Sequence, residues 1–151
     1  MSAAYPEGED LVWPAVDGDG QVALLITGGD GPIPAAFLAN RGSFVRTVES
    51  VVADMPVVSS ASACEAEYDD EDFTSLAQRG FFVYDWIGFY RAVSSDGVGY
   101  RRVAVPSSPL NIRVLTEPLA SMARLTRASG YFDALPLWDV RAQIECLSGH
   151  G

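Results

Sequence analysis

The chain offers no well-placed histidine base for nucleophilic catalysis. Its single histidine, His150, is the penultimate residue and has a glycine on each side. A serine or cysteine nucleophile needs a base held beside it, and a terminal histidine between glycines is a poor candidate for that base. Cys64 is followed by Glu65 and Glu67, whose negative charges disfavour the nucleophilic thiolate form. We therefore expect a protein that is not an enzyme.

The same residues argue against a metal or cofactor. Cys64 and Cys146 lack a metal-type spacing, so a tetrahedral zinc site would need carboxylates as well. The DGDG segment (17–20) departs from a calcium loop at the turn glycine and at the final bidentate acid, and we expect it to form a hairpin turn. The glycines of GGDGPIP (28–34) lack the Gly-Lys-Ser/Thr ending of a phosphate loop. No metal and no cofactor is predicted.

The densest group of ionisable side chains is acidic and lies in the segment 65–72. Its members are Glu65, Glu67, Asp69, Asp70, Glu71 and Asp72, and no basic residue occurs between Arg46 and Arg79. Three interpretations are open: ligands for a divalent ion or general acids, a solvated loop with a helix start, or a surface for a basic partner.

The segment RGFFVYDWIGFYRAV (79–93) is apolar on both alternating faces. That pattern is typical of a central strand covered on both sides, or one bent at Gly88. We expect most of its rings to lie in the core. Asp85 then pairs with a nearby arginine or caps a backbone turn, or else is an inward-facing acid with a perturbed pKa. Tyr84 and Tyr90 are candidates for contact with a partner.

The composition is that of one folded domain. The chain has 151 residues, of which 48% are hydrophobic, 20% charged and 11% aromatic, which is enough apolar content to exclude disorder over most of the length. No apolar run approaches the ~18 residues of a membrane span. The acidic start does not resemble an export signal, and the two cysteines lack a disulfide context. We expect a cytoplasmic protein.

Charge is distributed unevenly. Lysine is absent, so the ten basic residues are all arginine, against twenty acids. Residues 1–85 hold fifteen acids and three arginines, whereas residues 86–151 hold five acids and seven arginines. Such an acidic protein repels nucleic acid and anionic membranes and attracts basic partners.

Local patterns predict strands and three helices. Strands are expected at 11–16, 21–27, 79–93 and 98–106, with a last strand or short helix in 131–146. Helices are expected at 44–55, 69–80 and 117–128, with Ser43, Asp69 or Asp70, and Thr116 as caps. A short helical turn is expected at 35–40 and loops at 28–34 and 59–68. Pro14 places the first strand at an edge or a bulge.

This order predicts a single α+β domain over residues 1–151, with a mainly antiparallel sheet and three helices packed on it. Residues 146–151 are expected to form a frayed tail.

Four phrases carry a resemblance to known proteins. WPAVDGDGQV (13–22), GPIP (31–34), RGFFVYDW (79–86), and YRRVAVP (100–106) with its following Pro-Leu pair resemble small uncharacterised bacterial proteins of GC-rich genomes. In type, the small acidic chain without catalytic motifs also resembles the immunity proteins of polymorphic secreted toxin systems.

The resemblance implies a non-catalytic binding protein that occludes a basic toxin by electrostatic complementarity. The residues expected to contact that partner are Glu65, Glu67, Asp69, Asp70, Glu71, Asp72 and Tyr84. The alternative is a small-ligand-binding or accessory domain with an apolar pocket near Trp13, Tyr84 and Trp86. A third interpretation is an enzyme that uses carboxylates alone.

Overall fold

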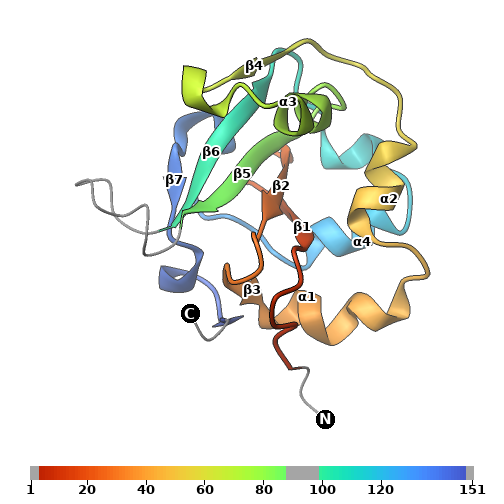
Figure 1. The fold of residues 1–151 in the computed structure, drawn as a ribbon. Helices are drawn as coiled ribbons and strands as arrows, with labels where there is room; N and C mark the ends of the chain where they lie inside the picture. Colours follow the sequence, from red (N-terminus) through yellow and green to blue (C-terminus); the bar gives the residue numbers. More distant parts are fainter. Residues whose placement is uncertain (1–3, 88–98, 149–151) are drawn as a thin grey trace.

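The computed structural model describes residues 4–87 and 99–148. Within them, helices cover both faces of a mixed, mainly antiparallel sheet (Figure 1). The predicted α+β class is confirmed, and the described residues contain four α-helices where three were expected. The helices are α1 (Ala35–Asn40), α2 (Val48–Ala53), α3 (Glu71–Ala77) and α4 (Leu119–Arg124).

The sheet has the strand order β1-β2-β5-β6-β4, and β7 also pairs with β6. Its strands are β1 (Val12–Val16), β2 (Val22–Ile26), β4 (Ala61–Ala63), β5 (Phe82–Ile87), β6 (Gly99–Pro106) and β7 (Leu137–Trp138). Strands β2 and β5 run parallel, and the other pairs are antiparallel. The aromatic segment 79–93 therefore contains a central strand, as predicted. Its residues 88–93 lie outside the described residues.

Strand β1 forms the predicted hairpin with β2 and lies at the edge of the sheet. Its free side is protected at three points. The amide of Val12 donates to Oε1 of Glu49 at 3.1 Å, Pro14 has no amide proton to offer, and Val16 bonds to Thr126 and Ala128 through backbone groups. An edge blocked in this way offers little to an additional strand.

The helix predicted at 44–55 is shorter than expected. Ser43 belongs to the 3-10 helix η1 (Arg41–Ser43) and Phe44 is extended, so Ser43 does not cap α2. The cap is Thr47, whose side chain accepts from the amide of Ser50 at 3.2 Å. The apolar side chains of α2 still form a stripe that faces the core, and Val48 and Val52 in it are buried.

Of the other two predicted helices, one has the cap that was expected and the other does not. Asp70 caps α3 as expected, and Gly80 follows with φ +97°, a conformation suited to glycine at a helix end. Helix α4 begins only at Leu119, after a cis Glu117–Pro118 bond, and no side chain caps it. Thr116 is therefore not its cap.

Three strands occur where loops or frayed ends were expected. Residues 59–68 were predicted to be a loop, but β4 forms there and pairs with β6. Strand β8 (Cys146–Leu147) pairs with β3 (Ile33–Pro34). The beginning of the expected frayed tail is therefore paired, and so is the end of the loop expected at 28–34. The region 131–146 contains both of the predicted kinds of structure, in short pieces: β7 and the 3-10 helices η5 (Phe132–Ala134) and η6 (Val140–Ala142).

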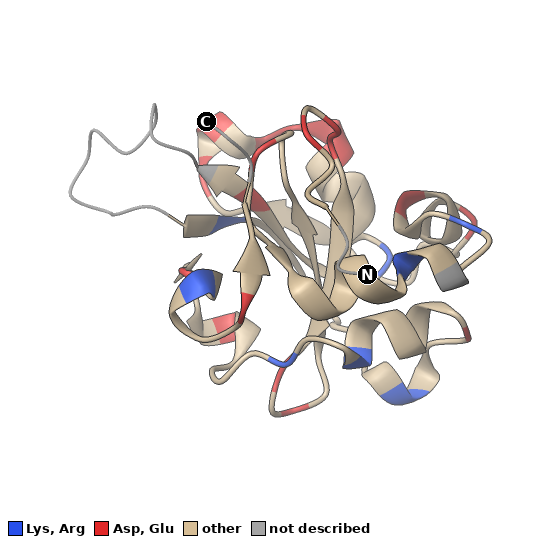
Figure 2. Ribbon diagram, turned by 90° about the horizontal axis from the view of Figure 1, so that it is seen from below, with Lys and Arg blue, Asp and Glu red and all other residues tan. Residues whose placement is uncertain are grey.

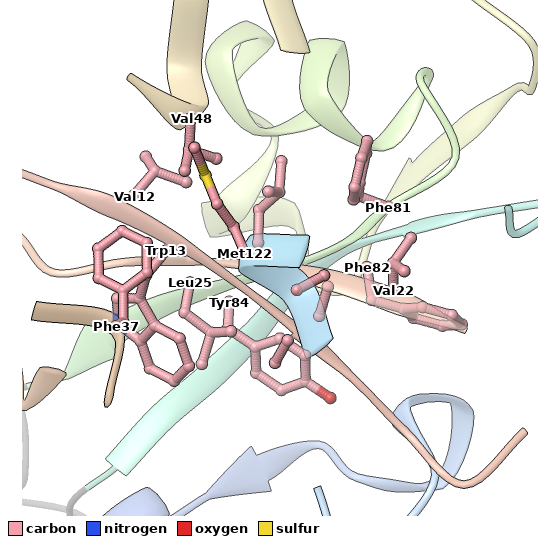
Figure 3. Close-up of a cluster of buried hydrophobic side chains, with 14 of the residues drawn as sticks. Val12, Trp13, Val22, Leu25, Phe37, Val48, Phe81, Phe82, Tyr84 and Met122 are labelled. Atoms are coloured by element: carbon pink, nitrogen blue, oxygen red, sulfur yellow. The ribbon is translucent and has the colours of Figure 1, made fainter. Parts of the chain in front are cut away.

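Two hydrophobic clusters fix the layers. The larger one joins β1, β2, β5 and β6 to α1, α2 and α4, and many of its side chains converge in Figure 3. The smaller one places Ala77 of α3 against Val83, Val103 and Ala104 on the other face. Successive side chains of β5 point to opposite faces of the sheet, so the strand contributes to both clusters. Phe82 and Tyr84 belong to the larger cluster and Val83 to the smaller one.

Candidate functional site: the acidic segment 65–72

The acidic segment 65–72 connects β4 to α3 and forms the 3-10 helix η2 (Ala66–Tyr68) before α3 begins. Figure 1 shows β4 and α3 side by side at one end of the sheet. All six of the acidic residues predicted to contact a partner are exposed: Glu65, Glu67, Asp69, Asp70, Glu71 and Asp72. The structure thus brings them together on one surface segment.

Hydrogen bonds and packing hold this segment in place. At its start, the amide of Cys64 donates to the carbonyl of Val103 in β6 at 2.8 Å. In its middle, the half-buried Tyr68 packs against the smaller cluster. At its end, Oδ1 of Asp70 accepts from the amide of Asp72 at 2.8 Å. The carboxylates are therefore displayed on an ordered backbone, which limits the conformational entropy that binding would cost.

The charge of the segment is largely uncompensated. Glu67, Asp69, Glu71 and Asp72 form no ion pair with any residue that the structure describes. Acidic and basic segments interleave elsewhere, on the face seen in Figure 2. In the described part of the chain, no group of three or more His, Cys, Asp or Glu side chains is placed to hold a metal ion, so the divalent-ion interpretation of this segment gains no support.

Tyr84 was wrongly predicted to contact a partner. Its side chain has no exposed surface, and its hydroxyl donates to the carbonyl of Leu135 at 2.7 Å. The ring also packs against Phe132, with 5.8 Å between centroids. The pairing of β5 between β2 and β6 causes this burial, because it turns Tyr84 into the larger cluster.

Two of the three residues expected to line an aromatic pocket, Trp13 and Tyr84, are buried in the core. Trp13 has no exposed surface, and its indole N–H donates to the hydroxyl of Tyr100 at 3.2 Å. Trp86 is half-buried and packs on Tyr100, and the guanidinium of Arg141 lies 5.5 Å from the centre of its ring. A cation at this distance from an indole face is attracted to it. Trp13 and Tyr84 are thus core residues in this structure.

The remaining candidates for chemistry are scattered. Cys64 is exposed, Cys146 is half-buried, and both are free thiols; burial raises the pKa of Cys146 to about 11, which keeps it protonated at neutral pH. Asp85 lies opposite Arg101 in the pairing of β5 with β6. His150 lies outside the described residues. Among the described residues, none of these groups forms a nucleophile–base pair.

Two features were missed by the sequence analysis. Asp17 is buried, and its carboxylate accepts from the amides of Asp19, Gln21 and Phe132. An apolar cavity of about 270 Å³ opens beside β1, with Arg41 and Arg46 in its lining. The Asp-Gly repeat indicated a turn at Asp17 but not the burial of its carboxylate. No local sequence pattern indicated the cavity.

Within residues 4–87 and 99–148, no helix has the length and apolar character needed to cross a bilayer. In comparisons with known proteins, no family model, curated protein or solved structure matched the chain.

Proposed function

We propose that the protein is a non-catalytic, acidic binding protein of the cytoplasm that captures a basic protein surface with the segment 65–72, in the manner of an immunity protein occluding a toxin. The observation that carries the proposal is the exposure of six acidic side chains on one ordered segment. Four of them are not neutralised by any described arginine.

Electrostatics favour this function over nucleic-acid or membrane binding. The chain carries a formal net charge of −10, and dense negative potential repels phosphate groups. A basic protein approaching the segment is attracted over about one Debye length, ~8 Å at physiological salt. Such steering accelerates encounter more than it slows dissociation, which suits an inhibitor that must act before its target does damage.

Two triple variants with the same change in charge provide the test. The first, Glu67→Gln, Asp69→Asn and Asp72→Asn, removes three charges from the acidic segment and keeps Asp70 as the helix cap. The second, Glu145→Gln, Asp30→Asn and Asp133→Asn, removes three exposed charges that lie elsewhere and whose side chains have no hydrogen bond or ion pair to a described residue.

Wild-type protein and both variants are immobilised and exposed to lysate of the cells that make the protein. The proposal expects one basic protein to be retained by the wild type and by the second triple variant, and to be lost or strongly reduced with the first. Retention by all three proteins alike would mean that the acidic segment is not the binding surface. Retention of no protein by the wild type would count against a protein partner altogether.

A further inference from the structure

A cavity of about 270 Å³ lies between β1, α1, η1 and α2. Its floor is apolar and comes from four separate segments of the chain. The floor residues are Leu11, Val12, Phe37, Val48 and Met122, none of them more than 8% exposed. Figure 3 shows Val12, Val48 and Met122 converging from β1, α2 and α4. Below the rim, a ligand in this cavity would contact mainly apolar side chains.

One wall of the cavity is apolar and open to solvent. Phe44 is half-buried and Val45 is 100% exposed, and both line the cavity. Both lie in the short stretch between η1 and α2. An exposed apolar wall beside a buried apolar floor is typical of a surface that a ligand covers.

The rim carries two arginines, in an otherwise acidic half of the chain, and one carboxylate, Glu9. Residues 1–85 contain three arginines, and two of them, Arg41 and Arg46, line this one cavity. Arg46 is held by Asp54 at 2.5 Å and by the carbonyl of Ser50 at 2.7 Å. Its charge is largely compensated.

Arg41 is held far less firmly. Among the described residues its guanidinium has one partner, Glu9, at 4.0 Å, and the two side chains are 37% and 55% exposed. An ion pair this long and this exposed contributes little. The guanidinium can therefore donate to an incoming anion, in the forked geometry that suits a carboxylate.

We propose that this cavity binds a small amphipathic carboxylate: its hydrocarbon chain lies on Val12, Phe37, Val48 and Met122, and its carboxylate accepts hydrogen bonds from Arg41. The volume lies just below the ~300–1,000 Å³ of sites for drug-sized ligands, so a medium-length chain fits and a long-chain lipid does not. This site is separate from the acidic segment, and its test does not depend on the protein partner.

A chain-length series tests the apolar part of the site. Hexanoate, octanoate and decanoate are titrated into the protein and binding is measured by calorimetry. Burial of each methylene group should raise the affinity about fourfold until the cavity is full. The absence of saturable binding for all three acids, or affinities that do not depend on chain length, would overturn the proposal.

Substitutions at the rim test the polar part. Arg41→Gln should lower the affinity for octanoate roughly tenfold, as expected for loss of a charge-assisted hydrogen bond, and leave the affinity for 1-octanol unchanged. Glu9→Gln should raise the octanoate affinity, because it removes a competing carboxylate. Arg113→Gln, an exposed arginine outside this cavity, is the matched control and should change neither.

A second variant tests carboxylate binding without changing Arg41. Val45→Glu changes a fully exposed side chain, so the fold should tolerate it, yet it places a negative charge in the wall of the cavity. It should weaken octanoate binding and leave 1-octanol binding largely intact. Octanoate affinities that are equal in wild type, Arg41→Gln and Val45→Glu would show that the carboxylate is not bound here.

Discussion

Asp17 is a buried carboxylate that joins two distant parts of the chain. Its carboxylate is 1% exposed and accepts from the amides of Asp19 and Gln21, each at 2.9 Å, and of Phe132 at 3.0 Å. The first two bonds close the hairpin between β1 and β2. The third fastens that turn to η5, 115 positions further along the chain.

Asp17→Ala should therefore lower the free energy of unfolding by about 3 kcal/mol, since it leaves one buried and two part-buried amides without their acceptor. Asp19→Ala is the matched control, because Asp19 lies two residues away in the same turn and its exposed side chain makes no hydrogen bond or ion pair with a described residue. Urea denaturation of the two variants measures the difference. Equal stability of both would contradict the role given to Asp17.

The buried tyrosines predict a loss of stability at high pH. Burial raises the pKa of Tyr5 to about 12, and raises the pKa values of Tyr84 and Tyr100 well above the ordinary value of 10.0. In the unfolded chain these phenols release their protons near that ordinary value, whereas the folded protein retains them. Between the two pKa values the folded state binds more protons, so stability falls as pH rises.

The free energy of unfolding, measured by urea titration between pH 9 and pH 11, should decrease with pH above 10. Tyr84→Phe should make the decrease shallower, because it removes one of the three phenols. Its stability at pH 7 should be lower by about 1 kcal/mol, the net contribution of the lost hydrogen bond to Leu135. An unfolding free energy that stays constant across this range would be inconsistent with buried, protonated tyrosines.

At the scale of the elements, α2 has a side-chain cap at its N-terminus and α4 does not. Thr47 accepts from the amide of Ser50 at the start of α2, whereas Thr116 does not cap α4. Thr47→Ala should lower the free energy of unfolding by about 1 kcal/mol, the usual cost of losing a cap, and Thr116→Ala should leave it nearly unchanged. Thermal denaturation of both variants checks the pair, and a larger loss for Thr116→Ala would reverse the assignment.

Elements with strong local signals were predictable. Each of these signals involves residues that are close together in the sequence. They are the Asp-Gly turn between two β-prone runs, the apolar stripe of α2, and Asp70 followed by an acidic first turn. Thr47 could have been chosen over Ser43, because it directly precedes Val48 and the first-turn acid Glu49. Both serine and threonine cap helices. Ser43 is excluded as the cap because it lies in η1, and no sequence pattern predicts that 3-10 helix.

Elements that depend on distant partners were not predictable. Strand β4 reads Ala-Ser-Ala, with no residue that favours strands, and it exists because β6 supplies its hydrogen bonds. The parallel pairing of β2 with β5 joins segments more than fifty residues apart. Local propensity contains no information about either contact.

At the scale of the whole molecule, the acidic segment was predictable and its surroundings were not. A run of six acids within eight residues is too costly to bury, so its exposure follows from composition. The burial of Tyr84 depends on which strands flank β5. The cavity beside β1 depends on Leu11, Phe37, Val48 and Met122 meeting from four segments, which only the tertiary structure determines.

The proposed function rests on long-range attraction between the segment 65–72 and a basic partner, and the salt dependence of association tests this attraction most directly. Stopped-flow measurements follow the captured partner binding to the wild type and to the two triple variants, between ~0.05 M and ~0.5 M salt, where the Debye length shrinks from about 14 Å to about 4 Å. We predict that the wild-type and Glu145/Asp30/Asp133 association rates fall together by at least about tenfold. The Glu67/Asp69/Asp72 variant should start slower and fall less. A wild-type rate that is indifferent to salt, or a Glu67/Asp69/Asp72 variant that associates as fast as the wild type at low salt, would contradict the account.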